Sequence, residues 1–238
     1  MNLVLLPSDS FNEKTGKARI TEQRQLLHCK KVLKSQIGDG LTLGKAGGDI
    51  YCGTITQINP EFIELQFGPP KKPPAAVQLK LILALPRPNM FKRILLDITS
   101  MGIKELHIIQ TQRVEKSYWM SPQLEPGHLR ERMQLGLEQA KDTIYPELFF
   151  HKNFNHFIKN FLPTLPPEPD KWIAHPGASN TLPTTLTKPS WLAIGPEGGF
   201  IDKELNSFEQ HGFQAAHMGE RVLRVETAVI AALGKLLL

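Results

Sequence analysis

The chain has 238 residues, of which 41% are hydrophobic and 21% are charged, and its formal net charge is +5. This composition fits one large or two modest globular domains with a real buried core, and it excludes a disordered or fibrous protein. The apolar stretches are shorter or more interrupted than the roughly 20 clean residues of a membrane span. The N-terminal residues have no basic leader, so we expect a cytoplasmic protein with no membrane partner.

Two cysteines, Cys29 and Cys52, are too few for a disulfide framework or a four-thiolate metal site, and the eight histidines form no metal-ligand pattern. We therefore predict no metal. The sequence also lacks the short motifs of common hydrolases, nucleoside triphosphatases and dinucleotide-binding proteins, which disfavours these three functions.

Residues 68–74 mark the boundary between two domains, because four of these seven residues are proline. Proline cannot donate a backbone hydrogen bond or continue a helix, so this segment is expected to be an extended, stiff connector. We predict one domain over residues 1–70 and a second over residues 75–238.

The first domain is expected to be a small β-barrel or sandwich. Residues 21–33 have the pattern of a short helix, and short β-branched runs follow at 41–43, 50–58 and 62–67 with turn signals between them. Residues 24–45 carry five cations and a single acid. This charge indicates either a nucleic-acid surface or a solvated helix face.

Apolar strands alternate with amphipathic helices in the second domain. The expected strands cover 77–85, 105–109, 148–150, 172–174, 191–194 and 213–217, and the expected helices cover 90–100, 129–141, 154–161, 203–211 and 225–237. This alternation predicts an α/β domain whose mainly parallel sheet has helices on both faces. Residues 168–189, rich in Pro, Thr and Ser, predict an inserted surface loop.

Two segments of the second domain have unusual residues where ligands of parallel sheets bind, beyond the carboxyl ends of strands. Residues 194–200 read Ile-Gly-Pro-Glu-Gly-Gly-Phe, and the glycines let backbone amides approach an adenine or a carboxylate. Residues 218–228 contain Gly219 at a strand exit and Thr227 in a first helical turn. The alternative for residues 194–200 is an ordinary turn, and the alternative for residues 218–228 is a structural salt-bridge cluster around Arg221.

Together these segments resemble the ribosomal RNA methyltransferases that modify N3 of a uridine in small-subunit RNA, members of the SPOUT superfamily of S-adenosylmethionine-dependent enzymes. Residues 28–34, His-Cys-Lys-Lys-Val-Leu-Lys, followed by Gly38 and Asp39, resemble the RNA-binding PUA-like barrel of the same family. The resemblance covers nearly the whole chain in the expected order.

The resemblance implies a PUA-like barrel followed by an α/β domain with a C-terminal trefoil knot, acting as a homodimer on ribosomal RNA or the small subunit. The apolar face of residues 228–238 would form the dimer surface, unless it is buried inside the monomer. S-adenosylmethionine would be held mostly by backbone groups, with Thr227 closing the pocket. The cofactor-binding residues implied are Ile194, Gly195, Glu197, Gly198, Gly199, Met218, Gly219, Val222, Leu223, Arg224 and Thr227.

Uridine N3 must lose a proton before it is methylated, and the resulting charge spreads over the base carbonyl oxygens. We expect Arg224 to stabilise that charge and Glu197 or Glu226 to accept the proton. The residues expected to contact RNA phosphates are Arg24, His28, Lys31 and Lys34, with a structural role as the alternative for His28.

Two signatures of the family are altered. Its Lys-x-Thr-Glu-Leu-Gly is replaced by residues 97–102, with Asp97 and Ser100 in place of the cation and the acid, and the Arg of its Glu-Gln-Ser-x-Arg is Asp142. We expect Asp142 to repel RNA phosphate, and Lys141 cannot reproduce the bidentate fork of arginine. These changes leave open another RNA target, another acceptor atom such as a ribose 2′-oxygen, or a non-catalytic RNA-binding assembly factor.

Overall fold

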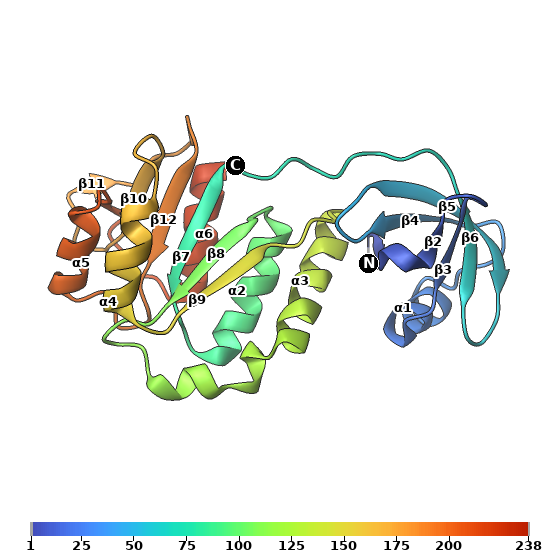
Figure 1. Ribbon diagram of the computed structural model, residues 1–238, viewed down its shortest axis with the longest axis horizontal. Helices are drawn as coiled ribbons and strands as arrows, with labels where there is room; N and C mark the ends of the chain where they lie inside the picture. The colour runs from blue at the N-terminus through green and yellow to red at the C-terminus, as the bar shows by residue number, and fades with distance from the viewer. Residues whose placement is uncertain (1, 238) are drawn as a thin grey trace. The chain divides into compact units, whose positions relative to one another are not determined.

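The computed structural model describes residues 2–237, which form two compact units (Figure 1). The first unit runs up to Ala75 and includes Gln134–Tyr145, and the second comprises Ala76–Met133 and the chain from Pro146 onward. Residues 134–145 come long after the proline-rich connector in the sequence, yet they pack with the first unit rather than with the second.

The first unit contains a six-stranded sheet in the order β1-β4-β5-β6-β3-β2, antiparallel except for the β1–β4 pair. Its strands are β1 (Val4–Leu6), β2 (Phe11–Asn12), β3 (Lys17–Ile20), β4 (Gly40–Lys45), β5 (Ile50–Ile58) and β6 (Ile63–Phe67). Side chains from all six strands meet in one buried cluster, so the sheet curls around its core as a barrel does.

The helix expected at residues 21–33 is present in two parts. It begins as α1 (Gln23–Leu27) and continues as the π-helical turn η2 (His28–Val32), and a 3₁₀ turn, η1 (Ser8–Ser10), precedes both. The sequence predicted β4, β5 and β6 but not β1, β2 and β3. These three strands have only two to four residues each, which is too short for an alternating pattern to stand out.

The second unit is built on a seven-stranded sheet in the order β11-β13-β10-β12-β7-β8-β9, and every pair in it is parallel. The strands are β7 (Leu79–Ala84), β8 (Glu105–Ile109), β9 (Glu147–His151), β10 (Asp170–Ala174), β11 (Asn180–Thr181), β12 (Ser190–Ile194) and β13 (Gln214–His217). The predicted α/β fold class is confirmed. One short strand, β11, lies within residues 168–189, for which we expected only a loop.

Helices cover both faces of this sheet (Figure 1). On one face α2 contacts α6. On the other face the ring of Phe157, in η5, packs against the ring of Phe208, in α5. The helices and helical turns from residue 76 onward are α2 (Pro88–Ser100), η3 (Lys116–Met120), η4 (Pro122–Leu124), α3 (Pro126–Ala140), α4 (Phe154–His156), η5 (Phe157–Phe161), η6 (Leu162–Thr164), α5 (Asp202–Glu209) and α6 (Val225–Leu237). Of these, α3 belongs to the second unit only up to Met133.

The apolar face of α6 is buried inside the chain. Val229, Ala232 and Leu233 have no exposed surface, and the helix packs against α2 and β12. We expected this face either to form the dimer surface or to be buried inside the monomer, and the structure shows that it is buried inside the monomer. The opposite face leaves Thr227 and Ala231 exposed. Among residues 2–237, no helix combines the length and the apolar character that a bilayer crossing requires.

Candidate functional site

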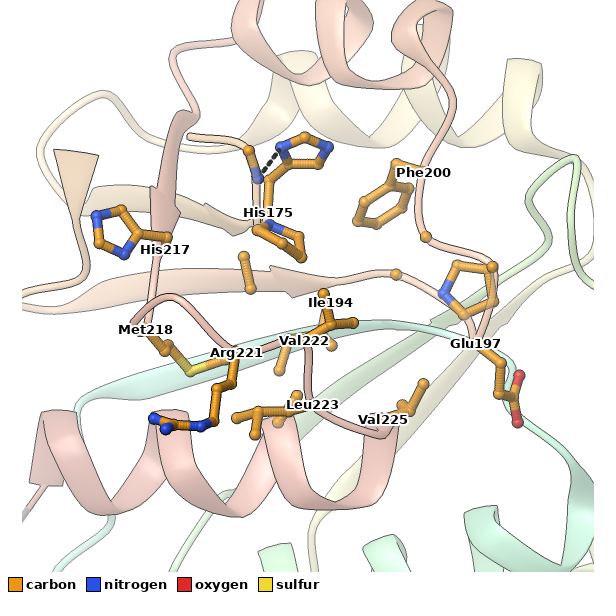
Figure 2. A pocket seen from close by; sticks show the side chains of 18 of the residues that line it. His175, Ile194, Glu197, Phe200, His217, Met218, Arg221, Val222, Leu223 and Val225 are labelled. Atoms are coloured by element: carbon orange, nitrogen blue, oxygen red, sulfur yellow. Dashed lines mark hydrogen bonds between the residues drawn. The ribbon is translucent and has the colours of Figure 1, made fainter. Parts of the chain in front are cut away.

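A cavity of about 330 Å³ lies at the carboxyl ends of β10, β12 and β13, lined by the loops that follow these strands (Figure 2). Its volume is in the range of small-molecule sites. In the sheet β10 lies between β12 and β13, so three loops that are far apart in sequence meet at one edge. This is the position at which parallel α/β sheets bind their ligands.

Two positions of the loop after β12 favour glycine. Gly199 has a φ of +72°, and its N–H donates to the carbonyl oxygen of Pro196 at 2.8 Å. A Cβ atom on Gly195 would lie 3.1 Å from the backbone nitrogen of Phe200, which is too close for an ordinary contact. The loop therefore folds tightly on itself, and its main chain lines the cavity.

Replacing Gly195 by alanine is expected to weaken binding of S-adenosylmethionine about tenfold, or about 1.4 kcal/mol. The new methyl group meets main chain, so the loop must shift out of its place on the cavity wall. Isothermal titration calorimetry measures the change. Gly127→Ala is the matched control, because nothing lies within 4 Å of its Cβ position. Equal affinity of the two variants would contradict the prediction.

Arg113 and Glu204 hold this loop in place through hydrogen bonds. The Arg113 guanidinium donates to the carbonyl oxygen of Gly198, and a Cβ on Gly198 would lie 2.9 Å from Arg113 Cδ. Glu204, 3% exposed, accepts from the backbone N–H of Gln112 at 2.7 Å and of Ile201 at 3.0 Å. One buried carboxylate thus joins the segment carrying Arg113 to the end of the loop.

Two histidines shape the opposite end of the cavity. Gly177 N–H donates to Nδ1 of His175 at 3.2 Å, and Gly219 N–H donates to Nδ1 of His217 at 3.1 Å. Each Nδ1 accepts a hydrogen bond and so carries no proton itself, which places the proton of the neutral ring on Nε2. In Figure 2, His217 and Met218 lie at one end of the cavity and Glu197 lies at the other.

Apolar side chains form the remaining wall. Ile194 and Phe200 are buried, whereas Leu223 and Val222 are 37% and 78% exposed at the rim. Large apolar side chains with this much exposure indicate a surface that a ligand covers. The cavity thus has main-chain N–H and C=O groups on one side and apolar side chains on the other. Such a lining can bind a nucleoside joined to an amino acid, so the cavity suits the expected cofactor.

Most of the expected cofactor-binding residues line this cavity, namely Ile194, Gly195, Glu197, Gly198, Gly199, Met218, Gly219, Val222 and Leu223. Arg224 and Thr227 do not, and both are exposed. Because α6 begins at Val225, its helical repeat turns Val225 and Ala228 toward the cavity and Thr227 away from it, whereas Arg224 precedes the helix and is exposed.

Several lining residues were not expected from the sequence, namely Arg113, Ala174, His175, Pro176, Gly177, Phe200, Ala216, His217, Val225 and Ala228. The Pro176-Gly177 turn directly after the expected strand 172–174 was a usable signal, since it follows the carboxyl end of a strand. Nothing local in the sequence marks Arg113.

The three expected catalytic residues, Arg224, Glu197 and Glu226, occupy different positions. Glu197 lines the cavity, and its Oε1 accepts from the backbone N–H of Arg87 at 3.0 Å, at the start of α2. Glu226 is half-buried in the first turn of α6, and neither it nor Arg224 is among the lining residues. The structure therefore gives Glu197 a second task, which is to fix the amino end of α2.

In the first unit, Arg24 is already engaged by carboxylates. Its guanidinium donates to both oxygens of Glu138, at 2.9 and 3.1 Å, and to Glu22 at 3.1 Å. Burial lowers the pKa of His28 on the following turn. Lys31 and Lys34 are exposed, so the structure leaves these two of the four expected RNA contacts open to solvent.

Asp142 corrects one expectation. Its side chain is 3% exposed, and Oδ1 accepts from the backbone N–H groups of Thr143 at 2.6 Å and Ile144 at 3.0 Å. The predicted repulsion of RNA phosphate is wrong, because this carboxylate closes a buried turn inside the first unit. Within residues 2–237 no cluster of three or more His, Cys, Asp or Glu side chains has the arrangement of a metal site.

Residues 73–237 match the RNA methyltransferase domain family. The ribosomal RNA small subunit methyltransferase E of Treponema pallidum is 29% identical over 98% of this chain and 89% of its own length. A small subunit methyltransferase E 1 of Borreliella burgdorferi is 27% identical over 98% and 95%. The structure is similar to that of the Neisseria gonorrhoeae methyltransferase E bound to S-adenosyl methionine, with a TM-score of 0.76 at 19% identity over 98% and 95% of the two chains. The chain belongs to the RNA methyltransferase domain family.

Proposed function

We propose that this chain transfers a methyl group from S-adenosylmethionine to N3 of a uridine in small-subunit ribosomal RNA. One observation carries the proposal: a glycine-rich loop meets two other strand-end loops around a cavity of cofactor size. The two relatives that match over nearly the whole chain are named ribosomal RNA small subunit methyltransferases, and the similar Neisseria structure holds this cofactor. A ribosomal RNA substrate also implies a cytoplasmic protein.

The chain's own residues would bind, orient and shield the reactants. The backbone of residues 194–199 and 218–223 would hold the cofactor, with Ile194, Phe200 and Leu223 excluding water from it. The cofactor supplies an electrophilic methyl group on a sulfonium. Because the transfer is an in-line displacement, catalysis depends mainly on alignment of donor and acceptor.

Arg224→Ala is expected to lower turnover about tenfold while binding of S-adenosylmethionine stays unchanged. A cation stabilises the charge that develops on the uracil oxygens, but solvent weakens the contribution of an exposed side chain. Initial rates at saturating cofactor measure turnover, and calorimetry measures affinity. Undiminished turnover would remove Arg224 from the catalytic residues.

Of the two candidate proton acceptors, we favour Glu197, because it lines the cavity and Glu226 does not.

The first unit would supply affinity for RNA through Lys31 and Lys34, whose exposed ammonium groups are free to neutralise phosphates. We also propose that the protein acts as a homodimer. With its apolar face buried, α6 can offer a partner only its other face, which includes Thr227 and Ala231. Light scattering of the purified protein tests the dimer.

The decisive experiment incubates the purified protein with methyl-labelled S-adenosylmethionine and small ribosomal subunits from a strain lacking the modification. We expect label in ribosomal RNA, and mass spectrometry of digested RNA is expected to find it at N3 of one uridine. Label at a ribose 2′-oxygen or in another RNA would replace the assigned target. Cofactor binding without any transfer would leave RNA binding as the function.

A further inference from the structure

A second cavity lies at the amino end of α2, in the same unit as the cofactor pocket. Its volume is about 560 Å³, and it shares no lining residue with the cofactor pocket. The first turn of α2 forms one wall, and η3 and η4 form the other. The lining residues are Arg87, Pro88, Asn89, Met90, Tyr118, Ser121 and Gln123. Nothing in the reaction described so far uses this cavity.

A single residue connects the two cavities. Glu197 lines the cofactor pocket, and its carboxylate accepts from the N–H of Arg87, which lines the second cavity, at 3.0 Å. Figure 2 shows Glu197 at the end of the pocket away from His217. A molecule in the second cavity would therefore lie close to Glu197 and to the glycine-rich loop that carries it.

The polar groups of the second cavity suit a planar base with carbonyl and N–H groups on one edge. The Tyr118 hydroxyl bonds to the Arg87 guanidinium, and this bond with the nearby Glu197 charge raises the pKa of Arg87, so the side chain stays cationic. In residues 2–237 the side-chain amides of Asn89 and Gln123 have no hydrogen-bond partner. They can donate and accept, and the Tyr118 ring offers a surface for stacking.

We propose that this second cavity receives the uracil that is to be methylated, with Arg87 facing one of its carbonyl oxygens. Recognition of an unstacked base by an aromatic ring and by hydrogen bonds to its edge is how proteins read single-stranded RNA. N3 gives its proton to the Glu197 carboxylate, the acceptor favoured above, and forms a bond to the methyl carbon, while the sulfur keeps the electron pair of the broken bond. Arg87 opposes the negative charge on the carbonyl oxygen. This inference rests on the proposed function.

Arg87→Ala tests the cavity without disturbing the cofactor pocket. The substitution keeps the main-chain N–H that Glu197 accepts, so we expect affinity for S-adenosylmethionine within about twofold of wild type. We expect methyl transfer to small subunits to fall about thirtyfold, as for a lost hydrogen bond to a charged group. Arg87→Lys keeps the charge and is expected to recover part of the rate. Arg93→Ala, an exposed arginine of the same helix that lines neither cavity, is the control.

A photocrosslink gives a readout that does not depend on methyl transfer. Small-subunit RNA transcribed with 5-iodouridine in place of uridine is irradiated with the protein, and crosslinked peptides are identified by mass spectrometry. We expect a crosslink at Tyr118 that weakens in Arg87→Ala. A wild-type protein that transfers no methyl group yet crosslinks at Tyr118 would overturn the proposed function but support the base site. Active wild type with an equally active Arg87→Ala variant, or crosslinks only outside this cavity, would overturn the inference.

Discussion

Replacing Glu138 by alanine is expected to lower the free energy of unfolding of the first unit by about 3–5 kcal/mol. Glu138 is 2% exposed, and its carboxylate accepts from the Arg24 guanidinium at 2.9 and 3.1 Å and from the Gln25 side-chain amide at 2.8 Å. Without the carboxylate, the half-buried Arg24 cation keeps only Glu22 as a partner, and the fully buried Gln25 amide keeps only the carbonyl oxygen of Leu5. The cost of leaving such groups unpaired exceeds the worth of an ordinary surface ion pair.

Hydrogen exchange of the β5 amides measures this loss, because these amides lie in the core strand of the first unit and report its opening. Glu138→Gln keeps one acceptor and the size of the side chain, so a smaller loss is expected. Glu13→Ala is the control, since Glu13 is exposed and pairs with Lys45 at 2.7 Å on the surface of the first unit. A loss for Glu138→Ala no larger than for this control would contradict the prediction.

Acid is expected to destabilise the second unit as the pH falls from 6.5 toward 4, through a buried pair of histidines. His107 Nδ1 and His151 Nε2 are 2.9 Å apart, and His107 Nε2 is 3.0 Å from Glu105 Oε1. Glu105 is also paired with Lys80 at 2.6 Å. The ionised Glu105 accepts the Nε2 proton of His107, so Nδ1 of His107 accepts from His151 and both rings are neutral.

Protonation of this pair is costly, since burial, reinforced by the His107 charge, lowers the pKa of His151 to about 4. Burial also lowers the pKa of His107. In the unfolded chain a histidine titrates near pH 6.5. Between pH 6.5 and pH 4 the unfolded chain binds more protons than the folded chain. The free energy of unfolding therefore decreases as the pH falls through this range, by about 3 kcal/mol for His151. Above pH 6.5 this contribution is complete.

Urea denaturation at a series of pH values tests this, followed by tryptophan fluorescence because the Trp191 ring lies 5.4 Å from the His107 ring. His151→Gln removes the titrating group while keeping an amide to bond His107, and we expect its stability to vary less between pH 6.5 and 4. His128→Gln, an exposed histidine on α3, should keep the wild-type pH dependence. Equal slopes for wild type and His151→Gln would refute the role of the pair.

The sequence by itself determined the features that local patterns encode. The apolar runs of β7, β8 and β12 and the helical spacing of α2 and α6 predicted a parallel α/β unit, because side-chain periodicity follows backbone geometry. Residues 194–200 were recognisable as a ligand loop, since closely spaced glycines and a proline restrict the main chain wherever they occur.

Only the tertiary structure decided which distant segments meet. Strand order placed β10 between β12 and β13, and this order brought His175 and Gly177 to the cavity. It also brought Arg113 to the glycine-rich loop and Glu138 to Arg24. Such contacts join residues far apart in the chain, and they are selected by packing and by the pairing of buried charges. Neither leaves a periodic mark on the sequence, so the partner of Glu138 and the burial of Asp142 had no local signal.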